Sequence, residues 1–330
     1  MFNDKSILVT GGTGSFGRQF AETVLNRYKP RRLIVYSRDE LKQFEMAQQF
    51  QHGAMRYFLG DVRDRARLVQ AMHGVDYVVH AAALKQVPAA EYNPQECIKT
   101  NIYGADNVIH AALAAGVSKV IALSTDKAAS PVNLYGATKL ASDKLFVAAN
   151  NMAGATGTSF SVVRYGNVAG SRGSVVPLFQ KLISEGATSL PITDARMTRF
   201  WITLQQGVDF VLKNFERMGG GEIFVPKLPS LRVVDLATAM APDLDQRVIG
   251  IRPGEKIHEV MVPADDARLT VEYDDHYVIR PSIVFTDRLT GAPGEGGKSV
   301  DEEFEYNSGN NPHFMTVDEI RVMHSALGGS

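Results

Sequence analysis

A glycine-rich turn near the N-terminus limits this chain to a small number of folds. The turn follows a short apolar run at residues 6–10 and precedes a helical pattern that continues to about residue 28. Its glycines Gly11, Gly14 and Gly17 are spaced three residues apart. Glycine at such positions permits a tight turn and lets the backbone approach a pyrophosphate at the N-terminus of the helix. Between a strand and a helix, this spacing predicts a dinucleotide site, with a plain tight turn as the alternative.

The turn opens a regular alternation of strand-like and helix-like segments. Continuous apolar runs are typical of strands buried in a parallel sheet. Helical patterns separate these runs, including those at residues 101–115 and 135–150. The predicted strands are residues 6–10, 32–36, 55–59, 76–80, 119–123 and 160–164. This alternation predicts an α/β fold, namely a Rossmann-type, doubly wound parallel sheet with helices on both faces.

Composition excludes several classes of function. The formal net charge is −1, whereas a nucleic-acid-binding protein would be expected to carry a basic excess. No apolar run approaches the ~20 residues that span a bilayer, and the N-terminus lacks a basic-then-apolar signal sequence. The single cysteine, Cys97, excludes an internal disulfide and is expected to be a small buried hydrophobic residue. We therefore predict a cytoplasmic protein without a nucleic-acid, membrane or metal partner.

The end of the second predicted strand bears on the choice of dinucleotide. NAD-binding proteins place an acidic residue there, about 20 residues past the glycines, where it binds the ribose 2′-hydroxyl. This chain has Ser37 and Arg38 instead, and Arg38 suits a 2′-phosphate, which favours NADP over NAD. Alternatively, Arg38 is solvated and Asp39 is the N-cap of a helix. Asp61, after the third strand, is placed either to accept from an adenine amine or to cap the next helix.

A change of pattern after residue 166 divides the chain. We expect residues 1–166 to form an NADP-binding Rossmann domain, with residues 198–218 returning to it. Residues 167–330 are expected to form a smaller mixed α/β substrate-binding lobe, mainly from residues 167–197 and 219–285. The tail that follows is expected to be loop-rich, because Gly, Asn and polar residues dominate residues 291–297 and 308–312.

A dense group of reactive side chains follows the fifth predicted strand. The segment Ser124-Thr125-Asp126-Lys127 ends that strand, and Tyr135 and Lys139 come four residues apart on the next predicted helix. Residues at i and i+4 share one helix face, so the ammonium of Lys139 can lower the pKa of the Tyr135 phenol. A phenol tuned in this way can give and take a proton near neutral pH.

Several of these motifs resemble the extended short-chain dehydrogenase/reductase family. They are the turn at residues 11–17, Tyr135-x-x-x-Lys139 and Arg164-Tyr165-Gly166-Asn167-Val168. Within that family the chain resembles the inverting UDP-N-acetylglucosamine 4,6-dehydratases, which open the pseudaminic acid pathway used to glycosylate flagellin. The segments that carry this second resemblance are Ser37-Arg38-Asp39-Glu40, His80-Ala81-Ala82-Ala83-Leu84-Lys85, Ser124-Thr125-Asp126-Lys127-Ala128, Met197-Thr198-Arg199-Phe200-Trp201 and Arg252-Pro253-Gly254-Glu255-Lys256.

The resemblance implies a redox-neutral lyase reaction with a tightly bound, recycled NADP. Tyr135 would take the proton of the sugar O4 while C4 is oxidised, and a neutral Lys127 would remove the C5 proton. A protonated Asp126 would donate to O6 as water leaves, after which hydride returns to C6 and reprotonation inverts C5. Lys127 would need its pKa lowered by roughly three units from ~10.4, through burial, Lys139 and the cationic nicotinamide. The alternative is that Lys127 only neutralises Asp126 in a salt bridge.

The same resemblance implies two sets of binding residues and a dimer or larger homo-oligomer. The substrate set contains two arginines as candidate diphosphate clamps, with surface ion pairs as their alternative. Thr125 would bind near the sugar O4 or cap the strand end. The cofactor set is Gly11, Thr13, Gly14, Ser15, Phe16, Gly17, Ser37, Arg38, Asp61, Val62, Ala81, Ala82, Ala83, Lys85, Tyr135 and Lys139. The substrate set is Lys85, Asn167, Val168, Arg199, Arg252 and Glu255.

Other hypotheses remain open from the sequence. A retaining 4,6-dehydratase or a 4-epimerase could use the same fold, but neither gives a reason for Lys127 beside Asp126. A non-catalytic NADP-binding regulator would have no use for Tyr135 and Lys139, and fold alone does not decide among these functions. His258 and the pair Phe200-Trp201 are expected to be structural.

Overall fold

The computed structural model describes residues 1–154, 157–170, 174–283 and 296–327. Its largest element is a ten-stranded sheet with the order β16-β14-β15-β10-β6-β5-β4-β1-β2-β3. From β3 to β10 along this order, neighbouring strands are parallel, as the predicted Rossmann-type sheet requires. These parallel strands are β1 (Ser6–Thr10), β2 (Arg32–Ser37), β3 (Met55–Leu59), β4 (Tyr77–His80), β5 (Lys119–Thr125), β6 (Ser159–Tyr165) and β10 (Ile223–Pro226).

The sheet is larger than the sequence indicated. β15 (His276–Ile279), β14 (Thr270–Glu272) and β16 (Lys298–Ser299) extend it as antiparallel strands beyond β10. The sequence analysis placed residues 219–285 mainly in the smaller lobe, whereas β10, β14 and β15 pair within the main sheet. Short strands of this kind carry too little pattern to show which sheet they join, because their pairing depends on contacts distant in the chain.

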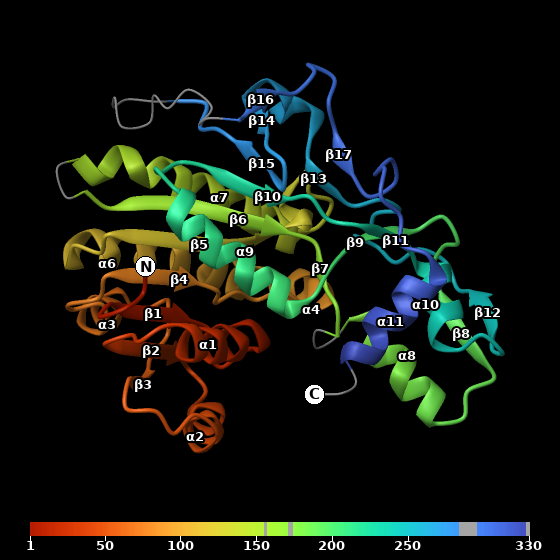
Figure 1. Cartoon of the computed structure of the whole chain (residues 1–330), viewed down its shortest axis with the longest axis horizontal. Helices are drawn as coiled ribbons and strands as arrows, with labels where there is room; N and C mark the ends of the chain where they lie inside the picture. Colours follow the sequence, from red (N-terminus) through yellow and green to blue (C-terminus); the bar gives the residue numbers. More distant parts are fainter. Residues whose placement is uncertain (155–156, 171–173, 284–295, 328–330) are drawn as a thin grey trace.

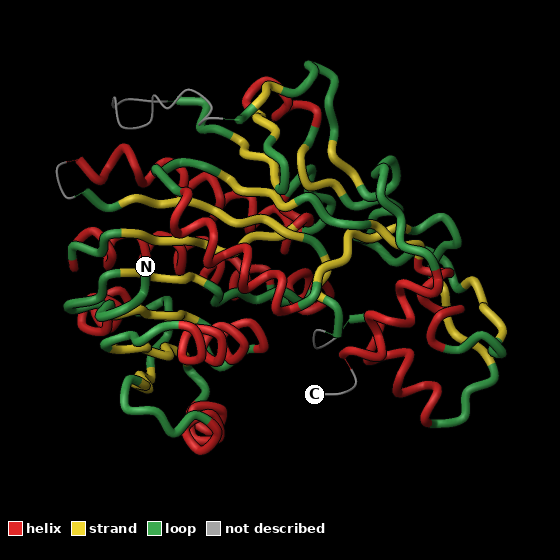
Figure 2. Tube along the Cα trace, in the orientation of Figure 1, coloured by secondary structure: helices red, strands yellow, loops and turns green. Residues whose placement is uncertain are grey.

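Helices cover both faces of the sheet, as Figures 1 and 2 show. α1 (Ser15–Arg27) packs against α9 (Leu204–Arg217) on one face, and α3 (Arg65–Ala71), α6 (Gly104–Ala115) and α7 (Leu134–Ala153) pack together on the other. The remaining helices of this part are α2 (Glu40–Gln49), α4 (Val87–Tyr92), α5 (Pro94–Ile98), the π-helix η1 (Lys99–Tyr103) and the 3-10 helix η2 (Asp126–Ala128). The predicted α/β class is thus confirmed.

α9 shows why a segment from the second half of the chain returns to the main sheet. Its N-terminus is closed by a capping box between Thr203 and Gln206, which satisfies backbone N–H groups that would otherwise lack partners. Its apolar face is buried, and the Phe215 ring lies 5.4 Å from the Phe2 ring and 5.7 Å from the Tyr77 ring. The helix is therefore held to the sheet by apolar burial.

A smaller lobe lies beside the carboxyl ends of the parallel strands (Figure 1). Its own core includes Phe179, Leu190, Trp201, Leu231 and Leu236, all buried. Its helices are α8 (Val175–Ser184), α10 (Val233–Met240) and α11 (Val317–Leu327), whereas the 3-10 helix η4 (Ala264–Leu269) adjoins β15 of the main sheet. The remaining short strands are β7 (Asn167–Val168), β8 (Ser189–Ile192), β9 (Thr198–Ile202), β11 (Ser230–Arg232), β12 (Asp245–Val248), β13 (Val260–Val262) and β17 (Tyr306–Asn307).

The tail differs from the loop-rich segment that we expected. α11 packs on α10, and its start is marked by Thr316 and Glu319, each of which accepts a hydrogen bond from the backbone N–H of the other. This capping-box pattern was present in the sequence and could have revealed the helix. Residues 308–312 do form a loop, but Ser308 and Asn311 are buried and hydrogen-bonded. Most of the predicted loop at residues 291–297 lies outside the described residues.

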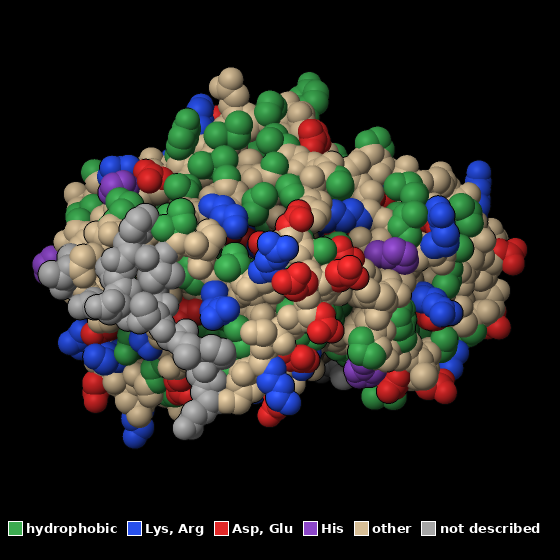
Figure 3. All heavy atoms as spheres, turned by 90° about the horizontal axis from the view of Figure 1, so that it is seen from above, with side chains coloured by type: hydrophobic (Ala, Val, Ile, Leu, Met, Phe, Trp, Pro, Cys, Tyr) green, Lys and Arg blue, Asp and Glu red, His purple; other side chains and the backbone are tan. Residues whose placement is uncertain are grey.

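The surface carries charges of both signs. On the face in Figure 3, Lys and Arg side chains are interspersed with Asp and Glu, in keeping with the formal net charge of −1. Across the described parts of the chain, no helix combines the length and the apolar composition needed to traverse a bilayer.

The buried imidazole of His80 should make the stability of the fold depend on pH. It ends β4, is 1% exposed, and its Nδ1 lies 2.8 Å from Thr10 Oγ1. Burial, assisted by the charge of Lys139, lowers the pKa of His80 to about 3. Between pH 3 and 6.5 the unfolded chain therefore binds the proton more readily, so stability falls as pH falls. From pH 7 to pH 5 we expect the free energy of unfolding of the wild type to fall by about 2 kcal/mol through His80. His80→Asn should lack this contribution when both proteins are compared by urea unfolding. Equal dependence of stability on pH in the two proteins would contradict this prediction.

Candidate active site

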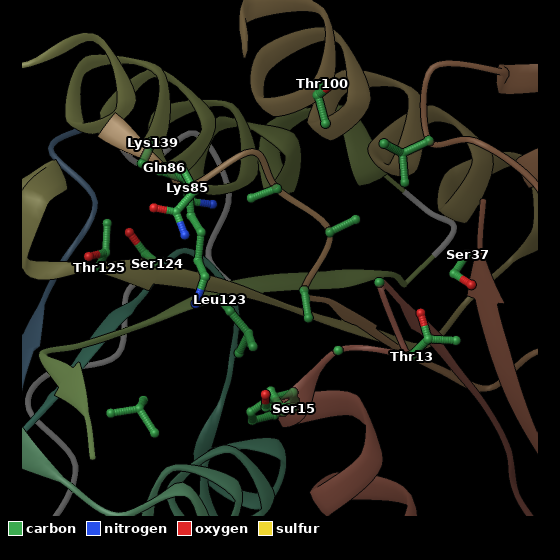
Figure 4. A pocket seen from close by; sticks show the side chains of 18 of the residues that line it. Thr13, Ser15, Ser37, Lys85, Gln86, Thr100, Leu123, Ser124, Thr125 and Lys139 are labelled. Carbon is green, nitrogen blue, oxygen red and sulfur yellow. The ribbon is translucent and has the colours of Figure 1, made fainter. Parts of the chain in front are cut away.

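A cavity of about 630 Å³ follows the carboxyl ends of the parallel strands, where ligands bind in open α/β sheets. Figure 4 shows Thr13 and Ser37 at one end, and Lys85, Lys139 and Thr125 at the other. The predicted binding residues that line it are Gly11, Thr13, Gly14, Ser15, Phe16, Ser37, Arg38, Asp61, Val62, Ala81, Ala82, Ala83, Lys85, Asn167 and Val168. The predicted catalytic residues Thr125, Asp126, Lys127, Tyr135 and Lys139 line it too.

The glycine turn forms a cradle that fits a dinucleotide. Gly11 has φ +64°, and a Cβ on it would lie 2.9 Å from the Cα of Ala82. Gly14 is the N-cap residue of α1 and no side chain caps this helix, so N–H groups of its first turn are available to a pyrophosphate. Gly17 does not line the cavity; a Cβ there would meet the Gly12 carbonyl oxygen at 2.2 Å. Its role is to let α1 pack closely on the turn.

Arg38, just after β2, is a cationic residue that lines the cavity. Asp39 is the N-cap of α2 and accepts a hydrogen bond from the Lys42 backbone N–H. The prediction that Asp39 caps a helix is therefore confirmed. Arg38 is about half exposed, and its Nη1 lies 3.5 Å from Asp61 Oδ2. Asp61 also accepts from the Arg63 side chain and backbone. Burial would raise the pKa of Asp61, but Arg63 outweighs it and holds that pKa below its usual range.

The structure rejects the alternative that Asp61 caps a helix. The N-cap of α3 is Asp64, which accepts from the Arg67 backbone N–H. A further polar group was missed by the sequence analysis: the Thr100 hydroxyl, on η1, is buried, lines the cavity and lacks a hydrogen-bond partner. A buried hydroxyl without a partner is costly, so a cofactor that bonded it would recover that cost. Isolated π-helical turns of this kind often mark functional sites.

The buried Asp126 and the partly exposed Lys127 form an ion pair at the end of β5. Lys127 Nζ lies 3.1 Å from Asp126 Oδ1 and 3.3 Å from Glu259 Oε1. The Thr125 hydroxyl donates to Asp126 Oδ1 at 2.9 Å and accepts from the Lys127 backbone N–H at 3.4 Å. Thr125 thus caps the strand end, as one alternative proposed. The alternative hypothesis, that Lys127 forms a salt bridge with Asp126, is met in part, because Lys127 contacts two carboxylates rather than one.

The surroundings of Lys127 correct the expected direction of its pKa. Burial lowers the pKa of this amine, but the negative charges of Asp126 and Glu259 outweigh burial and raise it above its usual value. We expected a lowered pKa because Asp126 was taken as protonated, and because Glu259, 132 residues further along the chain, was not recognised as a neighbour. Lys127 is therefore protonated in this arrangement, and a neutral amine requires that its proton move to a neighbouring group.

Tyr135 and Lys139 lie on the first turns of α7, both buried. The helix begins with Asn133, which accepts from the Gly136 backbone N–H, and a Cβ on Gly136 would meet the Lys127 carbonyl oxygen at 2.1 Å. Burial raises the pKa of Tyr135 to about 12, and Lys127 opposes this only in part. The expected lowering of that pKa by Lys139 is thus wrong. Burial also lowers the pKa of Lys139, against the charge of Asp143.

A second buried ion pair lies behind these residues, and the sequence analysis missed it. Asp143 and Arg164 are each 1% exposed and lie 3.2 Å apart. Asp143 also accepts from the Ser124 hydroxyl at 2.7 Å, and Arg164 Nη1 donates to the Met261 carbonyl at 2.9 Å. The pair therefore connects β5, α7 and β6 with β13. Only the i+4 spacing of Asp143 from Lys139 hinted at this contact.

Three predicted substrate-binding residues are absent from the described lining of the cavity, namely Arg199, Arg252 and Glu255. Arg199 is 12% exposed and its Nε lies 3.7 Å from Glu259 Oε1. Arg252 is exposed and lies 3.7 Å from Glu255, which is the ion-pair alternative. By contrast, Asn167 lines the cavity, and its Oδ1 atom is buried without a hydrogen-bond partner.

Two structural expectations for this region are met. His258 Nδ1 lies 2.8 Å from the Thr198 hydroxyl. Phe200 and Trp201 are buried in the two hydrophobic cores.

Comparisons with known proteins agree with this geometry. The model of a family described as polysaccharide biosynthesis protein matches residues 7–281. An inverting UDP-N-acetylglucosamine 4,6-dehydratase of Campylobacter jejuni is 63% identical over 324 residues, 97% of each chain. A UDP-glucose 4-epimerase of Rickettsia canadensis is 44% identical over 288 residues, 84% of each chain. The crystal structure of Pen from Bacillus thuringiensis aligns with a TM-score of 0.91 and 37% identity over 99% of both chains.

Proposed function

The chain belongs to the polysaccharide biosynthesis protein family, within the extended short-chain dehydrogenase/reductases, and we propose that it is an NADP-dependent, inverting UDP-N-acetylglucosamine 4,6-dehydratase, a hydro-lyase. The observation that carries the proposal is the contact of Lys127 with Asp126 in the same cavity as Tyr135. The 63% identity to a dehydratase of that name supports the substrate. A 4-epimerase leaves O6 in place and needs no acid–base pair for C5 and O6.

The glycine turn, Thr100 and Arg38 would hold the cofactor, and Tyr135 and Lys139 would lie at its reactive end. A nicotinamide held there would supply the redox chemistry, namely transient acceptance of the C4 hydride that later reduces C6. Tyr135 would take the proton of the sugar O4 in its phenolate form, which the positive charges of Lys139 and of a bound nicotinamide would favour against the effect of burial. Lys139, whose pKa burial lowers, lies on the same helix face one turn away.

Elimination of water needs a base for C5 and an acid for O6. One proton that moves across the 3.1 Å contact from Lys127 to Asp126 gives a neutral amine beside a carboxylic acid, while the pair keeps the same number of protons. Lys127 then takes the C5 proton and Asp126 gives its proton to O6. The C–O bond to O6 breaks, water leaves, and the pair returns to its first state. A proton derived from solvent then adds to C5 from the other face, which gives inversion.

The test is incubation of the full chain with UDP-N-acetylglucosamine and NADP in D₂O, with the product followed by NMR. We expect a 6-deoxy-4-keto sugar nucleotide with inverted C5 and one solvent deuterium at C5. A product with retained C5 would indicate a retaining dehydratase, and a product that keeps its 6-hydroxyl would indicate a 4-epimerase. No turnover with any sugar nucleotide would favour the regulator hypothesis.

We also propose the finer assignments that the resemblance implies. The product would enter pseudaminic acid biosynthesis for flagellin glycosylation, and the enzyme would be a cytoplasmic homo-oligomer. Deletion of the gene should then remove pseudaminic acid from flagellin, and light scattering should give a mass that is a multiple of 36.1 kDa.

We expect Arg38 to make the protein bind NADP more tightly than NAD. This residue lines the cavity just after β2, where charge-assisted bonds from its guanidinium to a 2′-phosphate would add roughly 1.5–3 kcal/mol. Arg38→Ala should raise the Kd for NADP by about 10- to 100-fold and that for NAD by less than about 3-fold, measured by isothermal titration calorimetry. Arg63→Ala is the control, because Arg63 also contacts Asp61 but does not line the cavity. Equal losses for NADP and NAD would contradict the role of Arg38.

A further inference from the structure

The carboxylate of Glu259 is part of the reactive cluster but has no role in the proton cycle described above. It is 3% exposed, and its Oε1 lies 3.3 Å from Lys127 Nζ. Its Oε2 is buried without a hydrogen-bond partner, and so is Oδ2 of Asp126. Two buried carboxylates thus contact one amine, each with an unsatisfied oxygen. A buried, partly unsatisfied charge is costly, so its presence here calls for a reason.

Glu259 is held firmly in place from outside the cavity. Its backbone N–H donates to the Ser308 hydroxyl at 2.9 Å, and its carbonyl accepts from the Ser308 backbone N–H at 2.8 Å. The Ser308 hydroxyl also lies 2.7 Å from the Thr198 hydroxyl on β9. Thr198 of β9, Glu259 just before β13 and Ser308 after β17 are thereby linked, which fixes the backbone that carries the Glu259 side chain next to Lys127.

The charges of the cluster balance whether the shared proton lies on Lys127 or on Asp126. In the first, Asp126 and Glu259 are anionic, and Lys127 and Arg199 are cationic. When the proton moves from Lys127 to Asp126, both become neutral, and Glu259 remains paired with Arg199, 3.7 Å away. When Lys127 then takes the C5 proton, it becomes a cation next to an Asp126 that is still protonated or only beginning to ionise. At that moment Glu259 is the one described carboxylate other than Asp126 in contact with Lys127 Nζ.

We propose that Glu259 is a positioning residue of the elimination step, whose carboxylate serves as counter-ion of the Lys127 ammonium while Asp126 carries the proton for O6. This inference rests on the proposed dehydratase function. Glu259 touches neither C5 nor O6; it acts through Lys127, by stabilising the cation that forms as C5 loses its proton. An opposite charge at this distance favours the charged form of an amine.

Other groups around Lys127 do not replace this carboxylate. Arg199 on β9, Lys85 after β4 and Lys256 before β13 are cationic and oppose a charge on Lys127. Tyr135 on α7 is a neutral phenol, since burial raises its pKa to about 12. Asp126 on η2 is engaged as the acid. Removing the charge of Glu259 would therefore leave the ammonium next to Arg199 without a counter-ion at the moment it forms.

The experiment compares wild type with Glu259→Gln, Glu259→Asp and the control Glu222→Gln. Glu222 is a partly buried carboxylate that accepts from the Ser161 hydroxyl far from the cavity, so the control makes the same chemical change elsewhere. Each full-length protein is assayed with UDP-N-acetylglucosamine and NADP for product, for deuterium exchange at C5 in D₂O, and for the near-ultraviolet absorbance of reduced nicotinamide. Thermal unfolding of each variant checks that it is folded.

We expect Glu259→Gln to lower kcat and C5 exchange by about 30- to 100-fold, with KM changed by less than about 3-fold. Because the step after C4 oxidation is slowed, reduced nicotinamide should accumulate in this variant and not in wild type. The pH profile of kcat should shift to lower pH by about one unit, since a negative charge beside the Asp126–Lys127 pair is lost. Glu259→Asp should restore most of the rate and the profile, and Glu222→Gln should match wild type throughout.

Three other outcomes would overturn the inference. A Glu259→Gln variant with wild-type rate and pH profile would show that Lys127 needs no second carboxylate. A loss of activity with an unchanged pH profile and without accumulated reduced nicotinamide would assign Glu259 a purely structural role. If wild type itself formed no dehydrated product, the proposed function would fail and this inference with it. The wild-type assay therefore separates the two failures.

Discussion

Replacing Lys127 with alanine is expected to lower dehydration of UDP-N-acetylglucosamine by about 10³-fold or more, because a positioned general base contributes roughly 10²–10⁴-fold. The substitution also leaves the Asp126 and Glu259 carboxylates facing each other without the ammonium that lies 3.1 and 3.3 Å from them. Deuterium exchange at C5 should be lost in the same proportion as product. The measurement is the NMR assay in D₂O, at saturating substrate.

A matched variant separates the base from the charge. Lys127→Arg keeps a cation between the two carboxylates, but a guanidinium does not give up its proton in proteins. It should therefore remain folded and bind substrate while C5 exchange stays as low as in Lys127→Ala. Near-wild-type exchange at C5 in either variant would remove Lys127 from the mechanism, and the salt-bridge hypothesis would then account for its position.

Breaking the buried pair of Asp143 and Arg164 is expected to destabilise the protein by about 3–5 kcal/mol, because the remaining charge would be buried and unpaired. Both side chains are 1% exposed, so water cannot replace the lost partner. Asp143→Leu and Arg164→Met should each show this loss in urea unfolding. Asp143 also raises the pKa of Lys139 against the effect of burial, so Asp143→Leu should lower that pKa further.

The double variant Asp143→Leu/Arg164→Met provides the control. Each member of the pair leaves one polar atom without a partner, Oδ1 of Asp143 and Nε of Arg164, so the pair is satisfied only in part. Removing both charges together should therefore cost less than either single change. A double variant whose loss equals the sum of the single losses would show that the two residues act independently.

Local pattern was sufficient for the elements built from neighbouring residues. The parallel strands of the first half are continuous apolar runs, and the largest difference at their ends is at β5, which reaches Thr125 rather than residue 123. The glycine turn and the i+4 pair of Tyr135 and Lys139 could be placed because their spacing matches the geometry of a turn and a helix. α11 was missed although its capping box was present in the sequence.

Contacts between distant segments could not be derived in this way. Glu259 carries no local signal for a functional role, yet it lies beside Lys127. Arg199 was expected to bind a diphosphate, and nothing near it in the chain indicated that it would face Glu259 instead. The expected pKa directions of Lys127 and Tyr135 were wrong for the same reason, because each depends on burial and on charges from other elements. The pairing of β10, β14 and β15 with the main sheet is also a long-range property.

The order of residues alone thus determined the fold class and the glycine turn, and it was sufficient to propose the reactive side chains, since these depend on spacing over a few residues. Only the tertiary structure decided the ionic state of the cluster, because burial and Coulomb interactions act through space and add contributions from segments more than a hundred residues apart. Lys127 illustrates both: the sequence places it beside Asp126, and burial, Asp126 and Glu259 together determine its charge.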